Sequence, residues 1–146
     1  MIRRELEILI LVANGPNINM LEYRDKNIYG HISENEIRRE LESRAQKDEN
    51  KIIWWQGNSQ GEIIDFLQNN YKSADGLIIN PAAYSHTSMA LKDCLDMLEI
   101  PVIEVHISNP IIRQRNLLTA AAVDAVIMGM GINSYISAYN YLLNII

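Results

Sequence analysis

The chain has 146 residues, a hydrophobic fraction of 48% and a formal net charge of −5 at pH 7. This length and composition predict one globular domain, residues 1–146, that is long enough to bury a real core. The acidic balance argues against a nucleic-acid-binding protein, because no basic stripe occurs and the cluster Arg3-Arg4 is too short to form one.

The single cysteine, Cys94, excludes an internal disulfide and is typical of a reducing compartment. We expect it to be a small buried residue on a helix rather than a nucleophile. No apolar stretch has the length of a membrane span, and no signal peptide precedes the first strand. We therefore expect a cytoplasmic protein without membrane contacts.

The first predicted element is a strand over the short, branched apolar run Ile8 to Val12, buried on both faces. The run ends at Asn14-Gly15-Pro16-Asn17, which strongly indicates a loop. The polar residues that this loop carries before Gly30 are Asn17, Asn19, Arg24 and Tyr29. Open α/β sheets bind ligands at the carboxyl ends of their strands, so we expect Glu7 to Gly30 to supply half of an active site.

Two capping boxes predict the next helices. Ser33 to Glu36 begins a helix that runs to about Glu49, and Ser59 to Glu62 begins a helix that continues through Leu67. Ser85 to Ser88 leads into a third helix that continues through Leu98 and ends before Pro101, and a last helix covers Ile132 to Ile146. The remaining predicted strands are Lys51 to Gln56, Gly76 to Asn80, Pro101 to His106 and Ala125 to Met128.

Strands and helices alternate along the chain with short connections, which predicts an α/β fold with a parallel sheet and helices on both faces. Right-handed crossovers favour a flavodoxin-like, three-layer sandwich with the strand order 2-1-3-4-5. In that order the first, third and fourth strands are neighbours, so their carboxyl ends share one edge.

Polar residues gather after these three strands. Two of the three histidines are among them: His86 follows the third strand, and His106 is the last residue of the fourth. Each such residue has a plainer interpretation, since a histidine at a strand end is more often structural and Tyr29 alone would more often be a packing aromatic. Glu104 is harder to dismiss, because a buried carboxylate needs a partner. Strand alternation puts Glu104 and His106 on one side, where the acid would orient the imidazole.

Four motifs, in the same order and at the same spacing along the whole chain, resemble those of type II 3-dehydroquinate dehydratases (type II dehydroquinases). They are NGPNINMLEYRDKNIYG (residues 14–30), QGNSQG (56–61), INPAAYSHTS (79–88) and EVHISN (104–109).

This resemblance implies dehydration of 3-dehydroquinate to 3-dehydroshikimate without a cofactor, a metal or a Schiff base. Tyr29 would be the base, and Arg24 would favour its charged form and close the loop over the substrate. Asn17 would stabilise the developing enolate, and His106, oriented by Glu104, would be the general acid.

The resemblance also implies the residues that bind the substrate. Asn80 and His86 would hydrogen-bond ring hydroxyls, and the backbone at Ile107 and Ser108 would hold the carboxylate. Asp93 would reach the site of a neighbouring subunit, because the family forms dodecamers of four trimers.

The chain departs from the family pattern at several positions. Glu22 and Lys26 replace a glycine and a proline in the mobile loop, Gln60 replaces a glutamate, and Ala82 replaces a glycine. The largest departure is the segment PIIRQRNLLTAAA, residues 110–122.

Two substrate arginines belong to this departing segment in the family. Arg113 matches the first of them. If the chain is aligned with the family pattern without a gap, the second arginine falls on Leu117. If a short deletion is allowed, Arg115 takes the position of that arginine. Loss of that arginine should weaken binding more than chemistry.

Three other function classes fit the residues less well. A response-regulator receiver needs acidic residues where this chain has Asn14 and Asn80, and a nucleotide-binding module needs a phosphate loop after the first strand. A metal hydrolase built on His86, Glu104 and His106 lacks tight ligand spacing. The strongest rival is a family member that lost or changed its activity through segment 110–122 and serves as a binding or scaffold protein.

Overall fold

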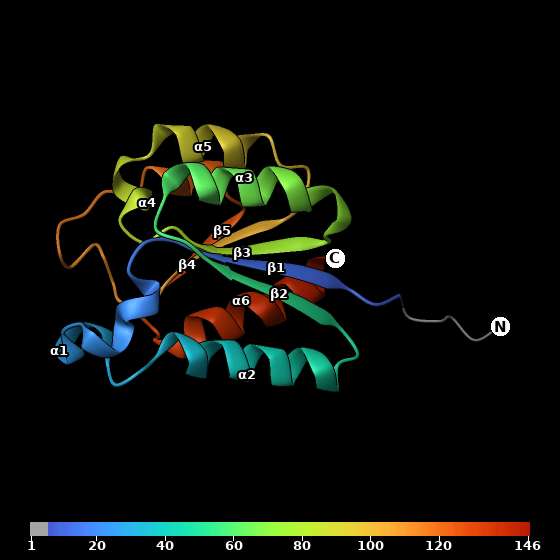
Figure 1. The fold of residues 1–146 in the computed structure, drawn as a ribbon, viewed down its shortest axis with the longest axis horizontal. Coiled ribbons are helices and arrows are strands. Elements are labelled where there is room, and N and C mark those ends of the chain that lie inside the picture. The colour runs from blue at the N-terminus through green and yellow to red at the C-terminus, as the bar shows by residue number, and fades with distance from the viewer. Residues whose placement is uncertain (1–5) are drawn as a thin grey trace.

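Five parallel strands form one sheet in the order β2-β1-β3-β4-β5, as the sequence predicts (Figure 1). The computed structural model describes residues 6–146, so Arg3-Arg4 lies outside the described part. The strands are β1 (Leu9–Asn14), β2 (Lys51–Gln56), β3 (Gly76–Asn80), β4 (Val102–His106) and β5 (Ala125–Met128).

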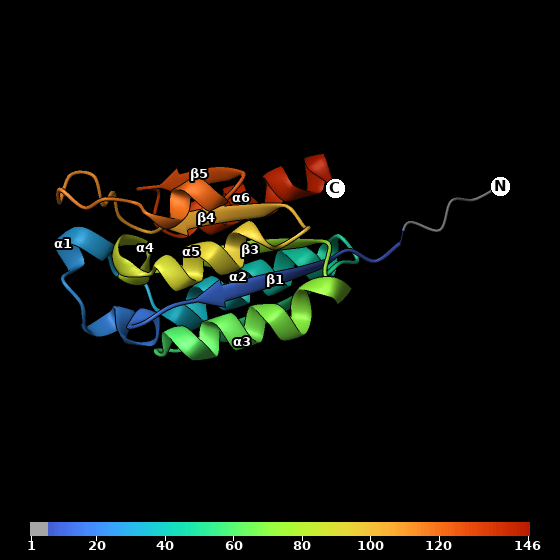
Figure 2. The same ribbon diagram turned by 90° about the horizontal axis from the view of Figure 1, so that it is seen from above.

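Helices cover both faces of this sheet and form three layers (Figures 1 and 2). Helices α2 (Glu34–Lys47) and α6 (Ile132–Ile145) lie on one face, and α3 (Gln60–Asn70) and α5 (Met89–Asp96) lie on the other. Successive strand residues point to opposite faces, so β1 sends Ile10 and Val12 into the first core and Leu11 and Ala13 into the second. Burial of β1 and β3 on both faces explains their continuous apolar runs.

Serine side chains cap three of the four helices that the sequence predicts, α2, α3 and α5. The hydroxyl of Ser33 accepts a hydrogen bond from the backbone N–H of Glu36 at 3.2 Å, and Ser59 accepts one from Glu62 at 3.5 Å. Ser88 caps α5 in the same way. The helix predicted to continue through Leu98 ends at Asp96 instead, where its last turn tightens into i→i+3 hydrogen bonds. Cys94 is buried in α5, as expected.

Several short helices lie between the helices and strands that the sequence analysis predicts. They are η1 (Ile18–Tyr23), α1 (Lys26–Tyr29), η2 (Tyr71–Ser73), α4 (Tyr84–Thr87) and η3 (Thr119–Ala122). One helical turn is too short to show a periodicity, so no sequence pattern predicts it. Asp25 caps α1 by accepting from the N–H of Asn27, and Gly30 ends it at φ 72°.

The turn after β1 packs directly against the turn after β3. The N–H of Gly15 donates to the carbonyl of Asn80 at 2.8 Å. A Cβ at Gly15 would lie 2.4 Å from the carbonyl oxygen of Pro81, so only glycine fits there. This close approach joins the two loops that carry the predicted site residues. Among residues 6–146, no helix is both long enough and apolar enough to cross a membrane.

Candidate active site

A cleft lies at the carboxyl edge of β1, β3 and β4 and encloses about 470 Å³ out to its open mouth. The lining residues come from the loops after these three strands, as the predicted strand order requires. They are Pro16, Asn17, Ile18, Arg24, Tyr29, Asn80, Ala82, Ala83, His86, His106, Ile107, Ser108, Arg113 and Arg115.

Tyr29 is the buried aromatic of this cleft. It ends the single turn α1, and its side chain is 9% exposed. Two guanidinium groups face its ring: the Cζ of Arg24 lies 4.0 Å from the ring centroid and that of Arg113 lies 5.5 Å from it. Two positive charges therefore lie against the ring of Tyr29.

His106 and Glu104 form a buried pair on β4. The Nε2 of His106 lies 2.8 Å from Oε2 of Glu104, and the Glu104 side chain is fully buried. The expectation that strand alternation puts both on one side and lets the acid orient the imidazole is confirmed. A carboxylate accepts, so Nε2 carries a proton here and Nδ1 is the ring nitrogen left for chemistry.

Thr119 is a member of this cluster that sequence reasoning missed. Its hydroxyl contacts the second carboxylate oxygen of Glu104, Oε1, and its side chain is fully buried at the start of η3. The N–H of Leu118 donates to the carbonyl of Ser85 at 2.7 Å and holds this segment in place. The threonine stands in the segment that departs most from the family pattern, and no local sequence signal points from it to β4.

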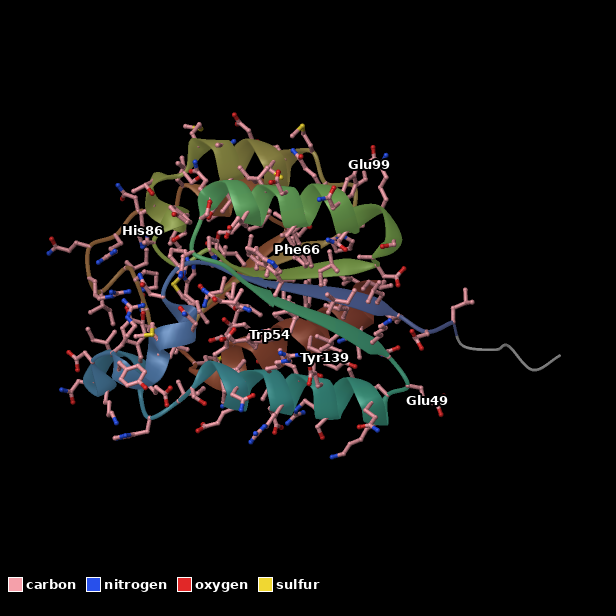
Figure 3. All side chains as sticks on the ribbon, viewed as in Figure 1. Glu49, Trp54, Phe66, His86, Glu99 and Tyr139 are labelled. Carbon is pink, nitrogen blue, oxygen red and sulfur yellow. The ribbon has the colours of Figure 1, made fainter. Side chains whose placement is uncertain are left out.

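His86 lies on α4 at the end of β3 (Figure 3). Its Nδ1 faces the carbonyl oxygen of Asn116, which can only accept, so Nδ1 carries the proton and Nε2 is the acceptor of the neutral ring. Burial lowers the pKa of His86 below its usual value, and the charges of Arg115, His106 and Arg113 lower it further, although the Asn116 bond opposes them. The neutral ring is therefore favoured.

The two arginines of the departing segment reach the cleft from the loop after β4. Arg113 donates from Nη2 to the hydroxyl of Ser108 at 3.2 Å. Within residues 6–146, the Nε of Arg113 is the buried side-chain nitrogen without a hydrogen-bond partner, so the guanidinium keeps an unused donor. Arg115 lines the cleft and Leu117 does not. Of the two residues that the sequence leaves open for the second arginine, Arg115 is the one that lines the cleft.

Two asparagines of the cleft are held by their neighbours. Asn17 adopts a left-handed conformation with φ 68°, which asparagine tolerates, and its N–H donates to Oδ1 of Asn58 at 3.1 Å. Asn80 is 3% exposed and is anchored through both ends of its amide.

Asp93 is the predicted site residue that the fold does not bring to the cleft of its own chain. It lies exposed on α5, away from the lining residues. Among the residues that the structure describes, no three His, Cys, Asp or Glu side chains are grouped so that they would hold a metal ion. The pair His106–Glu104 thus has no third ligand beside it.

Comparison with known proteins places these residues in a family context. The sequence model of the family described as "Dehydroquinase class II" matches residues 8–143. The 3-dehydroquinate dehydratase of Aliarcobacter butzleri is 44% identical over 129 residues, which cover 86% of this chain and 79% of that protein. The 3-dehydroquinate dehydratase of Thermotoga petrophila is 41% identical over 136 residues, covering 91% and 93%.

A solved structure is similar over almost the same range. The crystal structure of type II dehydroquinase from Butyrivibrio crossotus superposes with a TM-score of 0.87 and 36% sequence identity. The match covers 93% of this chain and 97% of that one. The similarity therefore extends over nearly the whole of both chains.

Proposed function

The chain belongs to the class II dehydroquinase family, and from that membership we propose that it converts 3-dehydroquinate to 3-dehydroshikimate and water, with Tyr29 as base and His106 as acid. The observation that carries this proposal is that Tyr29 and His106 line one cleft, each with a charged partner suited to its role.

The first step is removal of a proton from the carbon next to the substrate ketone. As a phenolate, Tyr29 accepts this proton, and the guanidinium groups of Arg24 and Arg113 stabilise its negative charge beforehand. The electron pair of the broken C–H bond moves toward the ketone oxygen and forms an enolate. Asn17, at the mouth of the same cleft, stabilises that oxygen directly or through a water molecule.

The second step is loss of the hydroxyl group, which leaves as water. His106 donates the proton to the departing oxygen from Nδ1, because Nε2 is held by Glu104. The buried carboxylate stabilises the imidazolium form that carries the transferable proton. The enolate then collapses, the carbon–oxygen bond breaks and the conjugated enone forms.

The other cleft residues bind the substrate. Asn80 and His86 hydrogen-bond ring hydroxyls, and the backbone at Ile107 and Ser108 holds the carboxylate. Arg115 takes the role of the family's second arginine, with Arg113 beside it.

The family pattern also supports an oligomer. We infer that Asp93, exposed on α5, reaches the cleft of a neighbouring subunit in trimers that assemble into a dodecamer. The mass in solution, measured by light scattering, tests this inference directly.

The test of the proposed reaction is the absorbance of the enone product after 3-dehydroquinate is added to the purified chain. We expect Tyr29→Phe to abolish turnover while fold and oligomer stay intact. The matched control is Tyr23→Phe, six residues earlier, because Tyr23 is 74% exposed and does not line the cleft.

Two results would contradict the proposal in different ways. Full activity of Tyr29→Phe would show that Tyr29 is not the base. A wild-type chain that binds 3-dehydroquinate but never converts it would favour the alternative, a family member that acts as a binding or scaffold protein.

A further inference from the structure

A chain of buried hydrogen bonds behind the cleft passes through Tyr135, a residue that has no part in the proposed reaction. Tyr135 lies on α6 and is fully buried. Its hydroxyl reaches the carboxyl ends of β1 and β3, where Asn14 and Asn80 are direct neighbours in the sheet. One end of this series of hydrogen bonds, at Asn14, does not line the cleft. The other end, Asn80, does.

The groups at the two ends of this series of hydrogen bonds determine which atom donates and which atom accepts in every bond. Nδ2 of Asn14 donates to the carbonyl of Trp55 at 3.1 Å, so Oδ1 of Asn14 accepts from the Tyr135 hydroxyl at 2.6 Å. The Tyr135 oxygen in turn accepts from Nδ2 of Asn80 at 2.8 Å. Oδ1 of Asn80 accepts from the backbone N–H of Ala82 at 3.1 Å. A carbonyl only accepts and a backbone N–H only donates, so the side-chain amides of Asn14 and Asn80 cannot flip to exchange their oxygen and nitrogen.

Two further features keep the Tyr135 hydroxyl in this arrangement. Burial raises the pKa of Tyr135 well above its usual value, so the hydroxyl keeps the proton that it donates to Asn14. The ring stacks on Trp54 with 5.9 Å between centroids, which holds the side chain on the α6 face of the sheet. The Asn80 amide thus has one orientation, with one N–H that finds no acceptor among residues 6–146.

We propose that Tyr135 is a positioning residue of the active site, whose buried hydroxyl orients the Asn80 amide so that its remaining N–H serves the substrate. The inference rests on the proposed function, since Asn80 contacts substrate only if the cleft binds it. Without the hydroxyl, Nδ2 of Asn80 loses the acceptor that holds it, and the amide keeps only the hydrogen bond from the N–H of Ala82. Substrate binding then suffers, whereas the proton transfers at Tyr29 and His106 do not.

The test is steady-state kinetics of Tyr135→Phe with 3-dehydroquinate. We expect KM to rise about tenfold, the value of one hydrogen bond, with kcat within about twofold of wild type. Asn80→Ala should raise KM similarly. The double variant should match Asn80→Ala alone, because Tyr135 acts only through Asn80.

Tyr139→Phe is the matched control on the same helix. Tyr139 is also fully buried, donates to Oδ2 of Asp48 at 2.8 Å and accepts from Nδ2 of Asn50 at 3.3 Å. It lies one helical turn further along α6, away from the cleft (Figure 3). Its loss should lower stability and leave KM unchanged, which separates positioning from a general weakening of the fold.

The outcomes distinguish this inference from the proposed function. A wild-type chain without dehydratase activity refutes both. An active wild type refutes the inference alone if Tyr135→Phe keeps its KM, if Tyr139→Phe raises KM equally, or if the double variant shows fully additive losses. Should Tyr135→Phe fail to fold, Asn14→Ala removes the acceptor of the same hydroxyl, and an unchanged KM in that variant overturns the inference.

Discussion

Thr119 allows a specific test of how the active site is held together, because a threonine and a valine side chain have the same shape and differ only in the hydroxyl group. In Thr119→Val, the Oε1 oxygen of Glu104 loses the hydroxyl donor that it contacts. Both Thr119 and Glu104 are fully buried, so water does not replace that donor without a rearrangement. The shape of the side chain is otherwise kept, which limits the change to hydrogen bonding.

The expected loss follows from the charge of the acceptor. A hydrogen bond to a charged group contributes about 1.5–3 kcal/mol, so Thr119→Val should lower the free energy of unfolding by about 2–3 kcal/mol. For a chain of this length, that corresponds to a fall in Tm of roughly 5–10 °C. A less well held Glu104 supports the His106 imidazolium less well, so kcat should fall about tenfold while KM stays close to wild type.

Thermal unfolding and steady-state kinetics measure both effects. Thr119→Ser keeps the hydroxyl and should recover most of kcat. Thr87→Val is the matched surface control, since the Thr87 hydroxyl only bonds the exposed carbonyl of Ala83 at 3.4 Å. Wild-type Tm and wild-type kcat in Thr119→Val would refute the reasoning, because the contact with Glu104 would then carry no energy.

Three more predictions concern binding, backbone strain and pH. Arg115→Met should raise KM about tenfold with little change in kcat, whereas Leu117→Met should leave both unchanged in the same assay, because only Arg115 lines the cleft. Ala82→Gly should raise the free energy of unfolding in urea by about 0.5–1 kcal/mol, since Ala82 has φ 52°; Ala83→Gly, at a helical φ of −62°, should lower it instead. Burial raises the pKa of Tyr139 to about 12, so between pH 10 and 12 the unfolded chain releases a proton that the folded chain keeps. Stability should therefore fall over that range, and it should fall less steeply in Tyr139→Phe.

The positions of the strands and long helices are the part of the fold that local patterns predict best. Continuous apolar runs such as Ile8 to Val12 are typical of strands buried on both faces, and serine caps such as Ser33 and Ser59 mark where helices begin. Each of these signals involves residues that are only a few positions apart, so it can be recognised without knowledge of the tertiary structure. The one-turn helices α1 and α4 escape them, because a turn is shorter than the period that would reveal it.

The candidate site also has one part that local patterns predict and another part that they do not. Glu104 and His106 stand two residues apart on one strand, so alternation alone predicts their contact. Which arginine follows Arg113 into the cleft cannot be read from spacing, since a deletion shifts the alignment. In the structure, the loop after β4 brings Arg115, and not Leu117, to the cleft.

The parallel sheet, its strand order and the edge at which the polar residues meet could all be predicted from the residues, because they depend on short-range periodicity and on general rules of chain connection. The contact of Thr119 with Glu104 and the link that Tyr135 makes between Asn14 and Asn80 became visible only in the folded molecule. Tyr135 is 121 residues from Asn14. Contacts between such distant segments arise when helices pack onto the completed sheet, and buried polar groups then select partners that no local pattern specifies.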